Sequence, residues 1–362
     1  MAISICMTDA YHQTYEDEIF QTSQCIWHEN ALMDWFRSQL IALGYESVSD
    51  NRKVWRCGDR TVVVCLVDDF TTCSDQYSMP TPYLFDSKTT VITDNWVSVP
   101  TQYQVLQLPR SFYGIYSHWP RDTQWRPDRR FALAVRRLDA KRLLLWLELE
   151  QRRSMQSDQT QDYVNFNAWS WDGDNSSDRG RRHSVDRQYQ LLEPQFRDIY
   201  RDTFERLLPQ VPVQNHSLSH EQMHVSAWMN LVMETYSSDA CVALSEKIFR
   251  AMCLPVPWAV YGGRHTVAYL RSMGFDVMPD IIQHRYDPAV ELRTAAYGDK
   301  MVDWLYEATD AVQHMQGQDW SQLVDRTQQA AHHNQALLAE FRRQWPADFA
   351  QWWSRTIIEI AK

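Results

Sequence analysis

Short apolar runs that end at a polar residue or a glycine alternate along this chain with segments of helical periodicity. In the second half of the chain the run Leu231–Met233 ends at Glu234, and the run Trp258–Tyr261 ends at Gly262. The amphipathic segment between these runs has the spacing of a helix, and another helical pattern follows the glycine. The order strand, helix, strand, glycine turn, helix predicts a parallel α/β unit.

Ligands of parallel α/β sheets bind beyond the carboxyl ends of the strands, where both Glu234 and the Gly262-Gly263 pair are expected. The intervening helix opens at Ser245, Glu246 and Lys247. A serine at the N-cap, exposed backbone N–H groups and a lysine charge together favour binding of a phosphate. The alternative is that Ser245 and Glu246 only cap the helix and that Lys247 is solvated.

The rest of the chain continues the alternation of strands and helices. Further strands are expected at residues 3–7, 61–67, 91–92, 105–108 and 131–135, and helices at residues 31–43, 139–150 and 320–361. Residues 151–162 and 172–187 are polar and are expected to be loops, and the Pro- and Arg-rich residues 119–130 are expected to be a linker. The predicted domains are residues 1–125 and residues 126–315, both of the α/β class, followed by C-terminal helices over residues 316–362.

Composition narrows the class of protein. The 362 residues are 44% hydrophobic and 23% charged, and no apolar run approaches the ~20 residues of a membrane span. The amino terminus lacks a signal-peptide pattern, and the seven scattered cysteines include no C-x-x-C, so a cytoplasmic location is expected. A net charge of −10 disfavours a large nucleic-acid surface, although a local basic groove remains compatible with it.

Several residue groups in the second half share the spacing of a known pattern. They are Glu234-Thr235, Ser245-Glu246-Lys247 with Phe249, Pro257-Trp258, Gly262, Tyr269-Leu270-Arg271 with Gly274-Phe275, and Tyr286-Asp287. This pattern resembles the donor-binding half of nucleotide-sugar glycosyltransferases of the GT-B type, especially the α-1,3-fucosyltransferase-like group and glycosyltransferase-like proteins of bacteria and phages. The chain departs from the pattern at Met233, where the family has Thr, and at Arg250-Ala251, where it has Lys-Pro.

The resemblance implies a fold and an activity. The fold would be two Rossmann-like domains, residues 1–125 on the acceptor side and residues 126–315 on the donor side. The C-terminal helices over residues 316–362 would cross back to the first domain and pack across both. The second domain would hold a nucleotide-sugar donor. Glu234, one of two candidate catalytic residues with Asp69, would fix the donor sugar or the loop beneath it, and Glu246 would accept hydrogen bonds from donor hydroxyls. Thr235, Gly262 and Gly263 would be further donor-binding residues. The sugar would pass to a hydroxyl of a glycan or protein acceptor without a metal ion or other cofactor. A DNA-base acceptor, as in phage enzymes, is the alternative.

Further donor and catalytic contacts are expected at strand ends. Arg137 and Arg142 follow the strand expected at residues 131–135, and the planar fork of an arginine can hold two oxygens of a pyrophosphate. A solvated helix face is the alternative for both arginines. A transferase that inverts the sugar also needs a base for the acceptor hydroxyl. Asp69 is the chosen candidate, ahead of Asp9, Asp68 and Asp94.

Three competing patterns point elsewhere. Residues 220–224 read H-E-x-x-H, which on a helix presents two imidazoles and a glutamate base to a zinc ion, as in metallopeptidases. Asp172-Gly173-Asp174 matches a short metal-binding pattern of other glycosyltransferases, but in a polar stretch with turn-forming residues. The departures at Met233 and Arg250-Ala251 also leave open a glycosyltransferase-like module without catalysis, which binds or has a structural role.

Overall fold

The computed structural model describes most of the chain. The described residues are 32–48, 54–65, 87–93, 96–97, 103–108, 124–137, 139–155, 163–169, 177–211, 220–234, 241–242, 244–288 and 297–361. The chain divides into two compact units: residues 1–118, 240–249 and 336–362 form the first, and residues 119–239 and 250–335 form the second. Helices and strands alternate as expected, so the predicted α/β class is confirmed.

The first unit is built on a five-stranded sheet. Its strands, in the order β1-β2-β3-β4-β6, are β1 (Glu46–Ser47), β2 (Val54–Cys57), β3 (Arg60–Cys65), β4 (Thr89–Thr93) and β6 (Gln104–Gln107). β1, β2 and β3 pair antiparallel, whereas β3, β4 and β6 are parallel. Val62, Val63 and Val64 are all at most 1% exposed, as expected for a strand that is covered on both faces. β5 (Trp96–Val97) and β10 (Cys241–Val242) form a separate antiparallel pair.

A helical pair also belongs to the first unit. The helix at residues 32–42 packs against the second half of α10 (Trp320–Ala361) through edge-to-face aromatic contacts. Trp35 lies 5.1 Å from Phe349 and 4.8 Å from Trp353 between ring centroids, and the Tyr45 hydroxyl donates to the Ile360 carbonyl at 3.1 Å. Aromatic pairs of this kind contribute about 0.5–1.5 kcal/mol beyond the area they bury.

The second unit contains a four-stranded, fully parallel sheet. Its strands, in the order β11-β9-β7-β8, are β7 (Arg129–Arg137), β8 (Tyr163–Trp169), β9 (Ala227–Met233) and β11 (Trp258–Tyr261). The chain runs outward from β7 to β8 and then returns to place β9 on the other side of β7. The order of the strands therefore reverses between β7 and β9, which makes this pair the topological switch point of the sheet.

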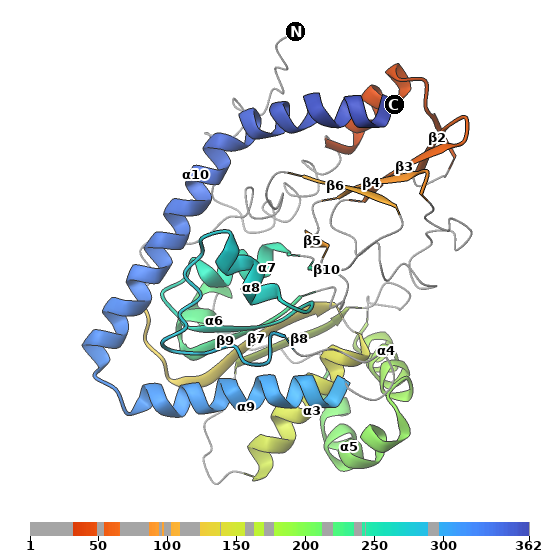
Figure 1. Cartoon of the computed structure of the whole chain (residues 1–362). Helices are drawn as coiled ribbons and strands as arrows, with labels where there is room; N and C mark the ends of the chain where they lie inside the picture. The colour runs from red at the N-terminus through yellow and green to blue at the C-terminus, as the bar shows by residue number, and fades with distance from the viewer. Residues whose placement is uncertain are drawn as a thin grey trace. The chain divides into compact units, whose positions relative to one another are not determined.

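Helices cover both faces of this sheet. α3 (Ala140–Met155) joins β7 to β8, and α4 (Asp178–Gln190), α5 (Pro194–Leu207), η1 (Leu208–Gln210) and α6 (His220–Val225) precede β9. The short helix α7 (Glu246–Met252), whose first four residues belong to the first unit, precedes β11 in the chain. α8 (Thr266–Ser272) and α9 (Tyr297–Gln316) follow β11, and Figure 1 shows α3 and α9 on one side of the sheet and α8 on the other. Leu143 to Leu147 of α3 are all at most 3% exposed, so this helix is buried around its circumference.

α4 lies partly in the segment that was expected to be a loop, residues 172–187, and that expectation was wrong from Asp178 onward. The helix begins where the Ser177 side chain accepts a hydrogen bond from the Gly180 amide at 3.1 Å. Only Val185 and Tyr189 supply buried apolar side chains, and the Tyr189 ring stacks on Phe204 of α5 at 3.8 Å between centroids. Two apolar contacts in thirteen residues give too weak a periodicity for the sequence pattern to reveal.

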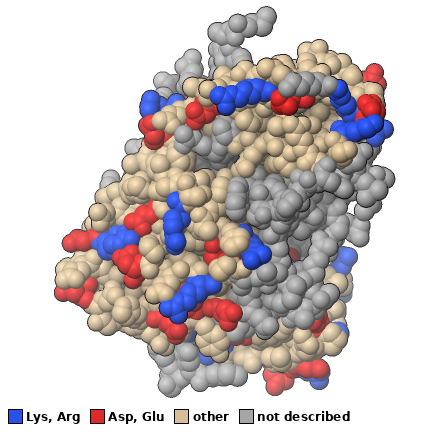
Figure 2. All heavy atoms as spheres, in the orientation of Figure 1, with Lys and Arg blue, Asp and Glu red and all other residues tan. Residues whose placement is uncertain are grey.

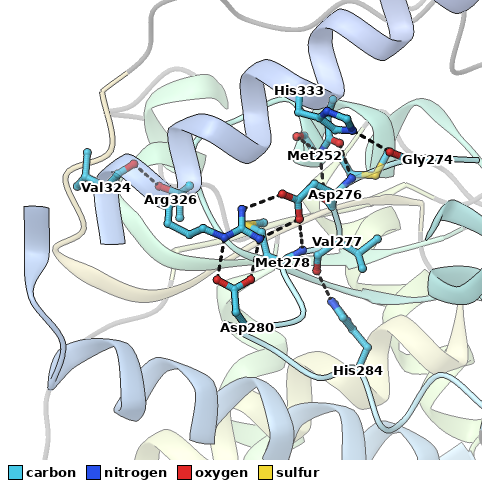
Figure 3. A network of polar contacts seen from close by, with 12 residues as sticks. Met252, Gly274, Asp276, Val277, Met278, Asp280, His284, Val324, Arg326 and His333 are labelled. Atoms are coloured by element: carbon cyan, nitrogen blue, oxygen red, sulfur yellow. Dashed lines mark hydrogen bonds and ion pairs between the residues drawn. The ribbon is translucent and has the colours of Figure 1, made fainter. Parts of the chain in front are cut away.

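The first half of α10 is held to the second unit by a polar network (Figure 3). The Arg326 guanidinium donates to both oxygens of Asp276, at 2.8 and 3.0 Å, and to both oxygens of Asp280, at 2.7 and 2.6 Å. Burial alone would raise the pKa of the Asp276 carboxyl, but the hydrogen bonds from Arg326 and from the Met278 amide, together with the Arg326 charge, outweigh it and hold that pKa below its usual value. Asn334 Nδ2 donates to the carbonyls of Met252 and Asp276, both at 3.0 Å.

None of the helices within the described ranges combines the length with the apolar character that crossing a membrane requires.

Candidate functional site

Three parallel strands of the second unit end at the same edge of the sheet. β7 ends at Arg137, β9 is followed by Glu234, and β11 is followed by Gly262. The Glu234 amide donates to the Tyr261 carbonyl at 2.9 Å, so the ends of β9 and β11 lie side by side. The structure therefore brings the predicted residues Glu234 and Gly262 to one edge, next to the switch point between β7 and β9.

Arg142 joins the ends of β7 and β9. It lies in the first turn of α3 and is 3% exposed, while Glu234 is 4% exposed. Arg142 Nη2 donates to the Glu234 carbonyl oxygen at 3.4 Å, and Arg142 Nε lies 3.6 Å from Asp139 Oδ2. The Asp139 side chain also accepts a hydrogen bond from the Arg142 amide at 2.8 Å, which caps the start of α3. A buried guanidinium thus holds the carboxyl end of β9 to the start of α3.

Arg137 is described only through its backbone. It pairs with Trp169 of β8, and the register of β7 with β8 shifts between Val135 and Arg137. Such irregularities re-aim side chains and are frequent next to active sites. The prediction that Arg137 contacts a pyrophosphate stays a prediction, and its backbone position at the end of the central strand is compatible with it.

The glycine turn after β11 is a closely packed connection to α8. A Cβ atom on Gly262 would lie 2.8 Å from Thr266 Oγ1, so no other residue fits here without displacement. The two oxygens of Asp287 accept hydrogen bonds from the amides of Val267 and Ala268, at 2.9 and 3.0 Å. The amide groups that open α8 are therefore already bonded to a carboxylate of the protein. A donor contact at Gly262 and Gly263 remains a prediction.

Tyr286, the neighbour of Asp287, stabilises the outer edge of β11. Its hydroxyl oxygen accepts a hydrogen bond from the Val260 amide at 3.0 Å and lies 2.9 Å from His284 Nδ1. His284 Nε2 lies 2.9 Å from the Val277 carbonyl, which can only accept, so Nε2 carries the proton and the Tyr286 hydroxyl donates to Nδ1. Burial lowers the pKa of His284 to about 4, which keeps the ring neutral, and burial raises the pKa of Tyr286. These groups therefore hold the loop in place.

Ser245 and Lys247 lie at the start of α7, within the first unit. The Ser245 hydroxyl oxygen accepts hydrogen bonds from the Lys247 amide at 3.4 Å and from Lys247 Nζ at 3.3 Å. Ser245 therefore caps the helix as the sequence predicted, and Lys247 is half-buried rather than fully solvated. The side chain of Glu246 lies outside the described residues, so its role stays a prediction.

Several predicted residues fall outside the described ranges. They are Asp69, with the other base candidates Asp9, Asp68 and Asp94, the donor-site residue Thr235, and the pair Asp172 and Asp174. Their predicted roles therefore stay predictions.

The H-E-x-x-H segment forms the six-residue helix α6. Its second histidine, His224, is 8% exposed, and its Nδ1 lies 2.8 Å from Oδ1 of the fully buried Asn230 of β9. Burial lowers the pKa of His224 to about 4. The side chains of His220 and Glu221 lie outside the described residues, and no group of three potential metal ligands occurs among the side chains that are described.

Two residues that the sequence analysis did not select have a clear place at this edge. Asp139 directly precedes α3, which is the N-cap signal that aspartate gives in a sequence. Asp287 was noted only as part of the Tyr286-Asp287 pattern, and its bond to α8 spans twenty residues, at 2.9 Å to the Val267 amide. No local signal in the sequence indicates the contact between Asp287 and the start of α8.

Surface charge does not mark a site on the face drawn in Figure 2, where basic and acidic side chains of the described residues are intermixed. A continuous basic surface of the kind that a DNA duplex requires is not formed by the described residues there.

Comparisons with protein-family models, with curated proteins and with solved structures give no significant match to this chain.

Proposed function

We propose that this chain is a glycosyltransferase that moves a sugar from a nucleotide-sugar donor to a hydroxyl acceptor without a metal ion. In this proposal it has the two Rossmann-like domains of the GT-B type, and residues 126–315 bind the donor. The observation that carries the proposal is the placement of two buried residues, Arg142 in the first turn of α3 after β7 and Glu234 at the end of β9, which are 3% and 4% exposed. Ligands of open α/β sheets bind at this switch point.

Each residue at this edge has a distinct role in the proposal. Arg137, at the end of the central strand, meets the pyrophosphate through its planar fork. Arg142 positions the end of β9 through its 3.4 Å bond to the Glu234 carbonyl, and the Glu234 carboxylate orients the donor sugar. Positive charge at the diphosphate leaving group stabilises the transition state by electrostatics, which is the contribution that a metal ion supplies in other transferases.

The acceptor in this proposal is a hydroxyl of a glycan or a protein. Asp69 stays the predicted base for that hydroxyl, and Ser245, Glu246 and Lys247 stay predicted donor contacts. A DNA acceptor is the second candidate, which the net charge of −10 disfavours because binding to a duplex depends on the neutralisation of phosphates.

Calorimetric titration with UDP, GDP, ADP, CDP and TDP in the presence of a chelator tests the donor site. We expect at least one nucleotide to bind, and we expect Arg137→Ala and Lys247→Ala each to weaken that binding by about 1.5–3 kcal/mol, as for the loss of a charge-assisted bond. The matched control is Lys88→Ala, because Lys88 is 56% exposed and pairs with Asp59 at 2.6 Å.

Two results would contradict the proposal. One is that none of the five nucleotides binds. The other is that the variants at Arg137, Lys247 and Lys88 all bind with the affinity of the wild type. If a nucleotide binds but neither its sugar ester is hydrolysed nor any sugar is transferred to a panel of acceptors, the chain is a binding module with a transferase-like fold.

A further inference from the structure

The first residue of α10, Trp320, presents an indole ring to solvent while two other indoles hold it. Trp320 is 42% exposed, and its ring centroid lies 4.9 Å from that of Trp125 and 5.6 Å from that of Trp228. Trp125 is 4% exposed, and its Nε1 donates to the Ala227 carbonyl at 2.7 Å. The exposed ring is therefore supported by a partner that is itself fixed to the backbone of β9.

The backbone under Trp320 is also fixed. Asp319 Oδ1 accepts hydrogen bonds from the Gln322 amide at 3.1 Å and from the Ser321 hydroxyl at 2.8 Å, and the Leu323 amide donates to the Asp319 carbonyl at 3.1 Å. This is an N-cap of α10. A ring that is held by both its neighbours and its backbone loses little entropy when it binds a ligand.

The chain neighbours of Trp320 are polar. The exposed neighbours in the chain are Gln316, Gln318, Asp319, Ser321 and Gln322, and residues 315–325 contain neither Lys nor Arg. Within residues 315–325, Trp320 is the large hydrophobic side chain that is exposed. Amide, hydroxyl and carboxylate groups around a flat indole suit a ligand with many hydroxyls and one apolar face.

We propose that Trp320 and the polar side chains around it form a binding site for a neutral saccharide, in which a sugar ring stacks on the indole. The amide groups of Gln318 and Gln322 hydrogen-bond the sugar hydroxyls. An exposed indole with polar neighbours suits a ligand of this kind, because the apolar face of the sugar ring stacks on the indole while its hydroxyls bond to the polar side chains.

This site is separate from the proposed donor site. Trp228 is the second residue of β9, and Glu234 follows the last residue of that strand. Six residues of extended strand span about 20 Å, so the two sites lie at opposite edges of the same sheet. The saccharide site therefore does not depend on the proposed transfer reaction. If that reaction occurs on a polysaccharide, this site holds a distant part of the chain.

Titration calorimetry with cellohexaose, maltohexaose and mannohexaose tests the proposal in the absence of nucleotide. We expect at least one hexasaccharide to bind, Trp320→Ala to weaken its binding at least tenfold, and Trp320→Phe to retain most of the affinity because a flat ring remains. Gln322→Ala keeps the backbone bond of the cap and removes the amide, and we expect it to weaken binding severalfold. The matched control is Tyr306→Ala, since Tyr306 is 57% exposed in α9 and packs under Arg152 at 4.3 Å.

Each of three results would overturn the proposal. The first is that no hexasaccharide binds at millimolar concentration. The second is that Trp320→Ala and Gln322→Ala bind as tightly as Tyr306→Ala. The third is that a single-stranded oligothymidylate binds in a Trp320-dependent manner while the saccharides do not, because bases also stack on indoles. The donor titrations use nucleotides and different residues, so failure of one proposal is distinguishable from failure of the other.

Discussion

Replacing Asp287 with Asn tests whether the carboxylate fixes the glycine turn at the functional edge. In the wild type the two oxygens accept hydrogen bonds from the amides of Val267 and Ala268, at 2.9 and 3.0 Å, at the start of α8. Asparagine supplies one acceptor oxygen and one NH₂ group, so one amide loses its partner and the favourable charge at the helix start is lost. Ala268 is exposed, and water can replace the partner of its amide. We therefore expect a cost of about 2 kcal/mol, in the lower part of the range for a charge-assisted bond.

Hydrogen–deuterium exchange of a peptide that covers residues 262–275 measures this cost locally. A loss of about 2 kcal/mol raises the equilibrium constant for opening, and with it the exchange rate, about thirty-fold. The control is Asp280→Asn, because Asp280 bonds to Arg326, is 52% exposed and makes no bond to α8. Equal exchange of this peptide in wild type and Asp287→Asn would refute the assigned role of the carboxylate.

Four further predictions concern other residues and the alternative functions. The pKa of His284 is about 4 in the folded chain and about 6.5 in the unfolded chain, so the unfolded state binds more protons between these two pH values. The contribution of neutral His284 to the free energy of unfolding is therefore complete above about pH 6.5 and falls by about 2 kcal/mol by pH 5. Urea unfolding of His284→Asn should lack this part of the pH dependence. Arg326→Lys keeps the charge but loses the fork between Asp276 and Asp280; with Arg326 25% exposed we expect urea unfolding to show a loss of only about 1 kcal/mol. If residues 220–224 bind zinc, elemental analysis will find close to one zinc per chain, and less than a tenth of an equivalent would rule out the peptidase hypothesis. Gel-shift titration with duplexes that contain hydroxymethylated bases, at two salt concentrations, should show no tight binding; micromolar binding that weakens steeply with salt would make DNA the leading acceptor.

Strands that are buried on both faces could be predicted from the sequence, because such a strand is an uninterrupted apolar run. Trp258–Tyr261 and Leu231–Met233 were predicted as strands on this basis, and β11 and β9 contain them in parallel register. The acid that ends one run and the glycine that ends the other were therefore placed at the correct edge. An apolar run indicates a buried strand from the chain neighbours of each residue alone.

Contacts between residues that lie far apart in the sequence could not be predicted from the sequence. The bond from Arg142 to the Glu234 carbonyl joins residues 92 positions apart, and the bonds from Arg326 to Asp276 join residues 50 positions apart. Either arginine in isolation fits a solvated helix face, because the sequence does not say which backbone the folded chain brings beside it. α4 was missed for a related reason, since it gains its stability from Tyr189 stacking on Phe204 of another helix rather than from its own periodicity.

The placement of acidic side chains in the second unit constrains how a phosphate ligand can be held there. Asp287 already accepts the hydrogen bonds of the first amides of α8, and Glu307 of α9 accepts one from the Tyr286 amide at 3.3 Å. Burial raises the pKa of Glu307, and hydrogen bonds from the backbone of His284, Arg285 and Tyr286 act against that rise. The backbone amides at the start of α8 and at Tyr286, which could otherwise bind an anion, are thus bonded to carboxylates of the protein. Under the proposed function, the phosphate charge in this unit must be met by arginine side chains at the end of β7. Nucleotide affinity should accordingly depend on arginine more than on the glycine turn, whose contribution is to hold α8 and the end of β11 in place.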